Sequence, residues 1–219
     1  MVTRDKQLMV LSGAMGLLAA ILVGTGEFLL HYDPLARFSE SGYEFMQAAS
    51  NPRQTVGHFL GVFGAPLYII GCWHIYLMLK PAGQKTALIA FFIGSFGFVM
   101  GTVWISSRAS IGALIHFQAT GGQVQPLVEL YRLRYETLLT VIRLTTLILS
   151  GLIVYGALTG KSHYPKLMAL FNPAVLLLLN FGVYLLLPSV GKFLMPIALN
   201  IGFGVFFILS LMQVRKIIF

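Results

Sequence analysis

The chain has 219 residues, of which 57% are hydrophobic and only 10% are charged, and its net charge is +8. Water-soluble domains contain about 25% charged residues, so this composition excludes a water-soluble fold. It predicts an all-α, polytopic membrane protein, because the apolar runs are long and continuous and lack the weak alternation of barrel strands.

Six apolar stretches are long enough to cross a bilayer, which takes about 20 residues in a helix. In chain order they cover residues 8–30, 56–79, 86–105, 138–158, 167–187 and 193–212. No polar linker separates them, so we expect residues 1–219 to form one domain, a bundle of six transmembrane helices. The first stretch is too long for the apolar region of a signal peptide, so it is expected to remain as a helix.

Two connections between these stretches are long and have structure of their own. Residues 31–51 include Phe38 and Phe45 among polar side chains, which predicts a short helix at the membrane surface. Residues 106–137 are interrupted by two consecutive glycines at 121–122, and the part that follows is predicted to be an amphipathic extension of the fourth helix. We expect both connections to lie on the outer side, where long loops commonly carry function.

The basic residues predict the orientation of the chain. Eight of the 15 Lys and Arg residues lie at the termini or in the short connections: Arg4, Lys6, Lys80, Lys85, Lys161, Lys166, Arg215 and Lys216. Cytoplasmic loops carry an excess of Lys and Arg, so both termini are predicted to be cytoplasmic. Because the basic residues flank apolar stretches, the expected partners are membrane lipids and not nucleic acid.

Glu27, near the end of the first stretch, gives the clearest indication of a site. A carboxylate in hydrocarbon costs a few kcal/mol, so it needs a partner or a purpose. His31 follows one helical turn later on the same face, and His58 lies about one turn into the second stretch at similar depth. Two imidazoles and one carboxylate can hold catalytic zinc or another divalent metal with one position open. Glu27, His31 and His58 are therefore candidate metal ligands and candidate catalytic residues, although no HExxH-like motif identifies a reaction.

Arginine residues at the same depth predict a ligand site. Arg132, Glu136 and Arg143 follow helical spacing on one face, and Arg108 extends from the end of the third stretch. Guanidinium groups bind phosphate or carboxylate in a two-pronged geometry. These four residues are candidate ligands for a lipid headgroup or another small amphiphile, in an outward-facing polar cavity that also includes Glu27.

Three alternatives remain open. Glu27 could pair with Arg143 as a purely structural contact, and the protein would then be a structural or sensory subunit. Glu27 could also be the protonatable group of a small proton-coupled transporter. Haem held by His58 and His74 is disfavoured, because His74 belongs to an aromatic cluster, at residues 73–76, that is typical of a membrane interface.

Two asparagines, Asn180 and Asn200, interrupt the last two apolar stretches near the expected membrane midplane. Side-chain amides at this depth hydrogen-bond between helices, at about 1 kcal/mol each, and mostly serve packing. Asn180 and Asn200 could hydrogen-bond to each other across the two helices in this way.

Two segments carry a resemblance to known sequences: residues 26–32, GEFLLHY, and residues 73–76, WHIY. In these segments the chain resembles a family of uncharacterised bacterial six-helix membrane proteins of similar length. The resemblance implies a place in the bacterial inner (plasma) membrane. It implies no activity, cofactor or site residue.

Overall fold

The computed structural model describes residues 4–37 and 43–218, and within these ranges the chain forms helices and no strands. The α-helices are α1 (Arg4–His31), α2 (Asn51–Leu79), α3 (Gln84–Ala119), α4 (Gln125–Leu158), α5 (Pro173–Leu186), α6 (Pro188–Leu194) and α7 (Ala198–Ile218). Short 3-10 helices are η1 (Glu44–Ala48), η2 (Lys80–Ala82), η3 (Lys166–Ala169) and η4 (Met195–Ile197). The predicted all-α fold is confirmed.

Five helical segments of the described chain are long and apolar enough to cross a membrane. They are α1, α2 with η2, α3, α4, and the run formed by α6, η4 and α7. These five segments contain the predicted stretches 8–30, 56–79, 86–105, 138–158 and 193–212.

The predicted fifth span, residues 167–187, is not a full crossing. α5 has only 14 residues, about 21 Å of helix, whereas the hydrocarbon layer is about 30 Å thick. The helix starts late because the side chain of Asn172 caps it, accepting hydrogen bonds from the backbone N–H groups of Ala174 and Val175, and Pro173 occupies its first turn. It ends early because Pro188 opens a new helix after Leu187.

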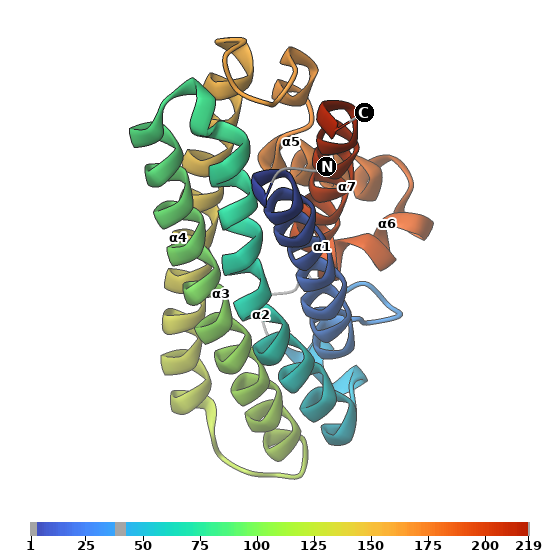
Figure 1. Cartoon of the computed structure of the whole chain (residues 1–219). Coiled ribbons are helices and arrows are strands. Elements are labelled where there is room, and N and C mark those ends of the chain that lie inside the picture. Colours follow the sequence, from blue (N-terminus) through green and yellow to red (C-terminus); the bar gives the residue numbers. More distant parts are fainter. Residues whose placement is uncertain (1–3, 38–42, 219) are drawn as a thin grey trace.

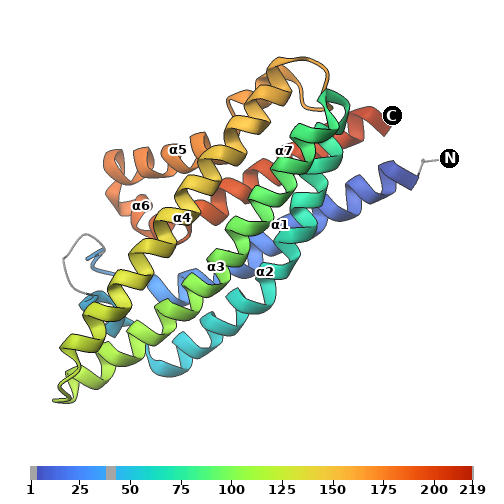
Figure 2. The same ribbon diagram turned by 90° about the vertical axis from the view of Figure 1, so that its left-hand side faces the viewer.

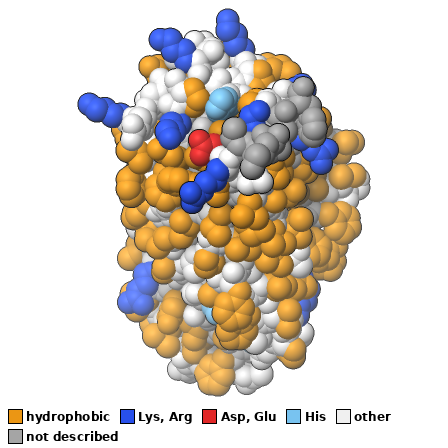
Figure 3. All heavy atoms as spheres, viewed as in Figure 1, with side chains coloured by type: hydrophobic (Ala, Val, Ile, Leu, Met, Phe, Trp, Pro, Cys, Tyr) orange, Lys and Arg blue, Asp and Glu red, His pale blue; other side chains and the backbone are white. Residues whose placement is uncertain are grey.

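The helices form one elongated bundle (Figure 1). α1 packs along α2, α2 along α3, and α3 along α4, while α7 packs against the other side of α1. α5 and α6 form a short hairpin beside the middle of the bundle (Figures 1 and 2). Figure 3 shows hydrophobic side chains covering the middle of one face, and Lys and Arg side chains gathered at the end that holds the termini.

Both chain termini lie at the same end of the bundle (Figure 1). The Lys6 ammonium donates a hydrogen bond of 2.8 Å to the carbonyl of Ile217, which joins the first and last helices there. The side of the membrane to which this end belongs stays a prediction.

The two long connections are more compact than expected. In the first, η1 has five residues, and its Phe45 and Met46 are buried in the bundle, so it does not lie flat on a surface. Gln54 of α2 holds this segment by donating to the carbonyl of Met46 at 2.9 Å. Phe38 lies outside the described residues. The second connection shrinks to residues 120–124, because α3 continues to Ala119 and the predicted extension of α4 is present from Gln125.

Candidate functional site

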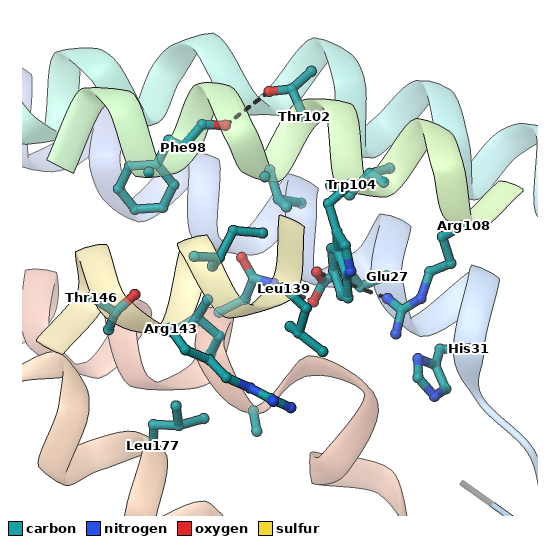
Figure 4. Close-up of a pocket in the computed structure, with 18 of the residues that line it drawn as sticks. Glu27, His31, Phe98, Thr102, Trp104, Arg108, Leu139, Arg143, Thr146 and Leu177 are labelled. Atoms are coloured by element: carbon teal, nitrogen blue, oxygen red, sulfur yellow. Dashed lines mark hydrogen bonds and ion pairs between the residues drawn. The ribbon is translucent and has the colours of Figure 1, made fainter. Parts of the chain in front are cut away.

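A cavity of about 410 Å³ lies between α1–α4 on one side and α5, η4 and α7 on the other (Figure 4). Most of its wall is apolar, with side chains such as Val23, Phe98, Leu149, Leu177 and Phe203. Its polar lining includes the following groups: Glu27, His31, Tyr43, Tyr68, Trp104, Arg108, Arg132, Tyr135, Glu136, Arg143 and Asn200. The structure therefore brings Glu27, His31, Arg108, Arg132, Glu136 and Arg143 to one cavity.

Glu27 is buried and joined to three other helices. Its Oε2 accepts a hydrogen bond of 2.6 Å from the amide of Asn200 on α7, and the amide oxygen of Asn200 accepts one of 2.7 Å from the hydroxyl of Tyr68 on α2. Its Oε1 lies 3.9 Å from Nη1 of Arg108 on α3 (Figure 4). Buried charges are retained when they are paired, and Arg108 supplies the opposite charge.

Arg108 is only 3% exposed, yet much of its donor capacity is unused. Its guanidinium lies over the ring of Trp104 at 4.3 Å, a cation–π contact. Its Nε and Nη1, and the indole Nε1 of Trp104, have no hydrogen-bond partner among the described residues. Buried donors are normally satisfied, so these groups have free capacity for an acceptor within the cavity.

One end of the cavity is covered by the segment that contains η1. Tyr43 and Phe45 are buried there, and the ring of His31 stacks on Phe45 at 4.6 Å between centroids. The hydroxyl of Tyr43 donates to Oε1 of Glu136 at 3.1 Å. Burial, with the neighbouring Glu136 charge, raises the pKa of Tyr43 well above its ordinary value, so this hydroxyl keeps its proton and remains a donor.

Arg143 differs from the other arginines of the site. Like Arg132 it is exposed, and its side chain extends from α4 into the view of the cavity (Figure 4), but it has no carboxylate partner among the described residues. No described carboxylate lies within ion-pair distance of it, whereas Arg132 pairs with Glu129 at 3.7 Å. The alternative of a Glu27–Arg143 ion pair is therefore wrong, since Glu27 pairs with Arg108.

The predicted metal set is not assembled. Glu27 and His31 line the cavity, but His58 does not, and its ring packs edge-on against Phe59 at 5.1 Å. Gly57 faces α1, so the next side chain points about 100° around the helix, away from Glu27. Across residues 4–37 and 43–218, no group of three or more His, Cys, Asp or Glu side chains could hold a metal ion.

His74 is also committed to other contacts. It is fully buried, with Nδ1 at 2.7 Å from the carbonyl of Met9 and Nε2 at 2.6 Å from the hydroxyl of Ser210. Both ring nitrogens are engaged, which leaves neither for an iron atom and agrees with the disfavoured position of haem. The two contacts of the His74 ring join α1, α2 and α7 near the chain termini.

The possible hydrogen bond between Asn180 and Asn200 is not formed. Asn180 donates to the carbonyl of Leu176 at 2.8 Å within its own helix and to the carbonyl of Ala198 on α7 at 3.4 Å, while Asn200 donates to Glu27. Tyr68 and Trp104 were not predicted as site residues. For Trp104 a sequence signal existed, because it precedes Arg108 by one helical turn and an aromatic ring at that spacing can stack on a guanidinium.

The fold and cavity define an all-helical protein with helices apolar enough to cross a membrane and a polar cluster buried between them. Residues 5–216 match DUF6796, a family of unknown function, and the chain belongs to this family. No curated protein and no solved structure matches the chain. The family assignment carries no activity, so the function has to be argued from the cavity.

Proposed function

We propose that this is an integral membrane protein whose cavity binds a small anionic amphiphile, a single apolar chain with a carboxylate or phosphate head. The observation that carries the proposal is the combination, in one cavity, of an apolar wall with the guanidinium groups of Arg108 and Arg143. Residues of five long segments surround the space, and most small-molecule sites combine an apolar lining with a few placed polar groups in this way.

The apolar part of the cavity suits a hydrocarbon chain. Its volume of about 410 Å³ lies in the usual range for ligand sites, about 300–1,000 Å³. Burial of each methylene contributes about 0.8 kcal/mol, so a chain seated against Phe98, Leu149 and Phe203 would supply most of the binding free energy.

The head group is assigned by charge. Glu27 is neutralised by Arg108, and Glu136 lies on the same face of α4 as Arg132, so the positive charge of Arg143 is the one left without a carboxylate neighbour in the described cavity. An anion would pair with Arg143, and the unused donors of Arg108 and Trp104 would supply further hydrogen bonds.

The proposed location is the bacterial inner membrane, with the termini in the cytoplasm. Support comes from the apolar segments and from the Lys and Arg residues that gather at the end carrying both termini (Figure 3).

Proton-coupled transport by Glu27 has weaker support. The chain Tyr68–Asn200–Glu27 is polar, but the fully buried rings of Phe206 and Phe207 follow on α7 before Ser210 is reached. A proton path toward the termini would have to pass this apolar layer. A purely structural role has no use for an open cavity of this size.

Quenching of Trp104 fluorescence by a brominated fatty acid tests the proposal. The chain has two tryptophans, and Trp73 is partly exposed, so Trp73→Phe leaves Trp104 as the only reporter inside the cavity. In phosphatidylcholine vesicles, quenching should saturate with the mole fraction of the brominated acid. The absence of saturable quenching would refute the proposal.

Two further variants make the test specific. Gly101 lines the cavity, and a Cβ there meets nothing within 4 Å, so Gly101→Leu should fill the space and abolish quenching. Gly151→Leu, on the exposed face of α4, is the matched control and should change nothing. Arg143→Gln should weaken binding of the acid by about tenfold to a hundredfold, because a hydrogen bond to a charged group contributes about 1.5–3 kcal/mol. The same variant should leave binding of a brominated alcohol unaffected.

A further inference from the structure

We infer that the ligand reaches the cavity sideways from the bilayer, through an opening between α4 and α5 beside Arg143, so that the amphiphile is a membrane constituent and not a solute from the water. This inference rests on the proposed function and adds the source of the ligand and its route.

α4 and α5 touch near one end and separate toward the other. The backbone N–H of Ala174, in the first turn of α5, donates to the hydroxyl of Ser150 on α4 at 3.0 Å. About two helical turns away, Arg143 on α4 and Phe181 on α5 both line the cavity and are both exposed. Exposed side chains that also line a cavity mark a mouth, so the cavity opens between these two helices. Arg132 and Glu136 are exposed lining residues as well, and they mark a second, charged mouth beside the η1 segment.

Short and broken helices form another part of the cavity wall. α5 ends at Leu186, and the backbone passes through α6 and η4 before α7 begins. Met195 and Pro196 of this irregular segment line the cavity. Irregular backbone at membrane depth is tolerated where it lines a cavity, and here it lines the wall beside α1.

The end of the cavity near His31 is narrowed by the described part of the η1 segment. Tyr43 and Phe45 are buried across it. Three contacts fasten the segment: Tyr43 donates to Glu136, Gln54 donates to the carbonyl of Met46, and His116 Nε2 lies 2.6 Å from the carbonyl of Ala49. Moving the η1 segment aside would break hydrogen bonds from α2, α3 and α4 at once, and the rim beside it carries the charges of Arg132 and Glu136. The side opening, with its apolar rim, is therefore the easier route for a hydrocarbon chain.

The surface around the side opening matches a lipid environment. Leu144 and Leu147 on α4 and Leu178 on α5 are more than half exposed, and all three are apolar. Arg143 is the one described charged residue among the lining groups from residues 139–149, which places a cation at the mouth of an apolar surface. An anionic head moving within the bilayer would meet Arg143 first and the buried donors of Arg108 afterwards.

A cross-link across the opening tests the route. Leu139 and Phe181 line the cavity from α4 and α5, one on each side of the opening, so Leu139→Cys with Phe181→Cys, in a Trp73→Phe, Cys72→Ala background, provides a pair for a bismaleimide linker. The matched control joins Ser150→Cys to Ala174→Cys, where the helices already touch. The measurement is the rate at which Trp104 is quenched after vesicles containing the protein are mixed with vesicles containing the brominated fatty acid.

We expect the Leu139–Phe181 link to slow quenching by about tenfold or more, because it blocks the approach of the acid, and the control link to leave the rate unchanged. Unchanged quenching with the first link, together with faster quenching in Tyr43→Ala, would overturn the side route and leave the proposed function standing. A rate that follows the aqueous concentration of the acid and not its mole fraction in the vesicles would overturn the membrane source. Failure of the proposed function would differ from both, because no arm would show saturable quenching of Trp104.

Discussion

Asn200 on α7 donates a hydrogen bond of 2.6 Å to the carboxylate of Glu27 on α1. The second oxygen of the same carboxylate lies 3.9 Å from the guanidinium of Arg108 on α3. The amide oxygen of Asn200 accepts a hydrogen bond from the hydroxyl of Tyr68 on α2. One buried carboxylate therefore joins the first three helices to the last one, and it lies in the wall of the cavity.

Removal of the Glu27 charge should destabilise the protein strongly. Glu27→Ala leaves Arg108 buried without its counter-charge, which typically costs about 3–5 kcal/mol. Denaturant unfolding in detergent micelles would measure the loss. The matched control is Glu129→Ala, which breaks the half-exposed pair with Arg132 and should cost less than about 1 kcal/mol. Equal losses in the two variants would contradict the assigned role of Glu27.

The contact between α1 and α2 should tolerate no added methyl group at Gly26. A Cβ there would lie 2.6 Å from the carbonyl oxygen of Gly57 and 2.7 Å from the backbone nitrogen of Gly61, neither of which can move alone. Gly26→Ala should therefore lower the free energy of unfolding by at least about 1–3 kcal/mol. Gly151→Ala, where the added Cβ meets nothing, should be neutral or should stabilise by up to about 1 kcal/mol. Equal stability of the two variants would show that the helices do not approach this closely.

The position of the helices was largely predictable, because apolar length alone determines where a chain can cross hydrocarbon. The prediction failed at residues 167–187, because hydropathy does not register where a helix can start within an apolar stretch. Asn172 and Pro173 start a helix at that point whatever the hydropathy of the residues before it, so the apolar residues Leu167–Ala169 fall in η3.

The polar cavity was predictable in its members but not in its pairings. Arg108 and Arg143 lie at similar expected depth, so the sequence could not decide which of them faces Glu27, because that depends on how each helix is rotated about its axis. The same rotation removes His58 from the site and brings Asn200 into it. Depth is a property of one helix, whereas pairing is a property of the whole bundle.

Stability should depend on pH through His163, in the connection between α4 and α5. Burial lowers the pKa of His163 below its ordinary value of 6.5, so near that value the unfolded chain binds a proton that the folded chain does not. The contribution of this residue to stability is constant above about pH 6.5, and stability falls as the pH is lowered toward the depressed folded pKa. The difference in melting temperature between wild type and His163→Gln, followed from pH 8 to pH 5 in roughly half-unit steps, isolates this effect. A difference that does not change with pH would contradict it.

The orientation of the chain can be read by cysteine labelling in intact bacterial cells. Gln123 is exposed in the connection between α3 and α4, and Lys161 is exposed at the opposite end of the bundle. With cytoplasmic termini, a membrane-impermeant maleimide should label Gln123→Cys in intact cells and Lys161→Cys only after lysis. The native Cys72 is fully buried and serves as an internal blank. The reverse labelling pattern would overturn the assignment.

The fastening of the chain ends has a consequence for engineering. Lys6 donates a hydrogen bond to the carbonyl of Ile217, and the two ring nitrogens of His74 contact the carbonyl of Met9 and the hydroxyl of Ser210, so the start of α1 and the end of α7 are fixed beside each other. A short peptide joining the two ends would bridge neighbouring points, and new ends could be cut at Gly121, in the exposed turn at the far end of α3. Such a circularly permuted chain should fold to the same bundle with its cavity intact.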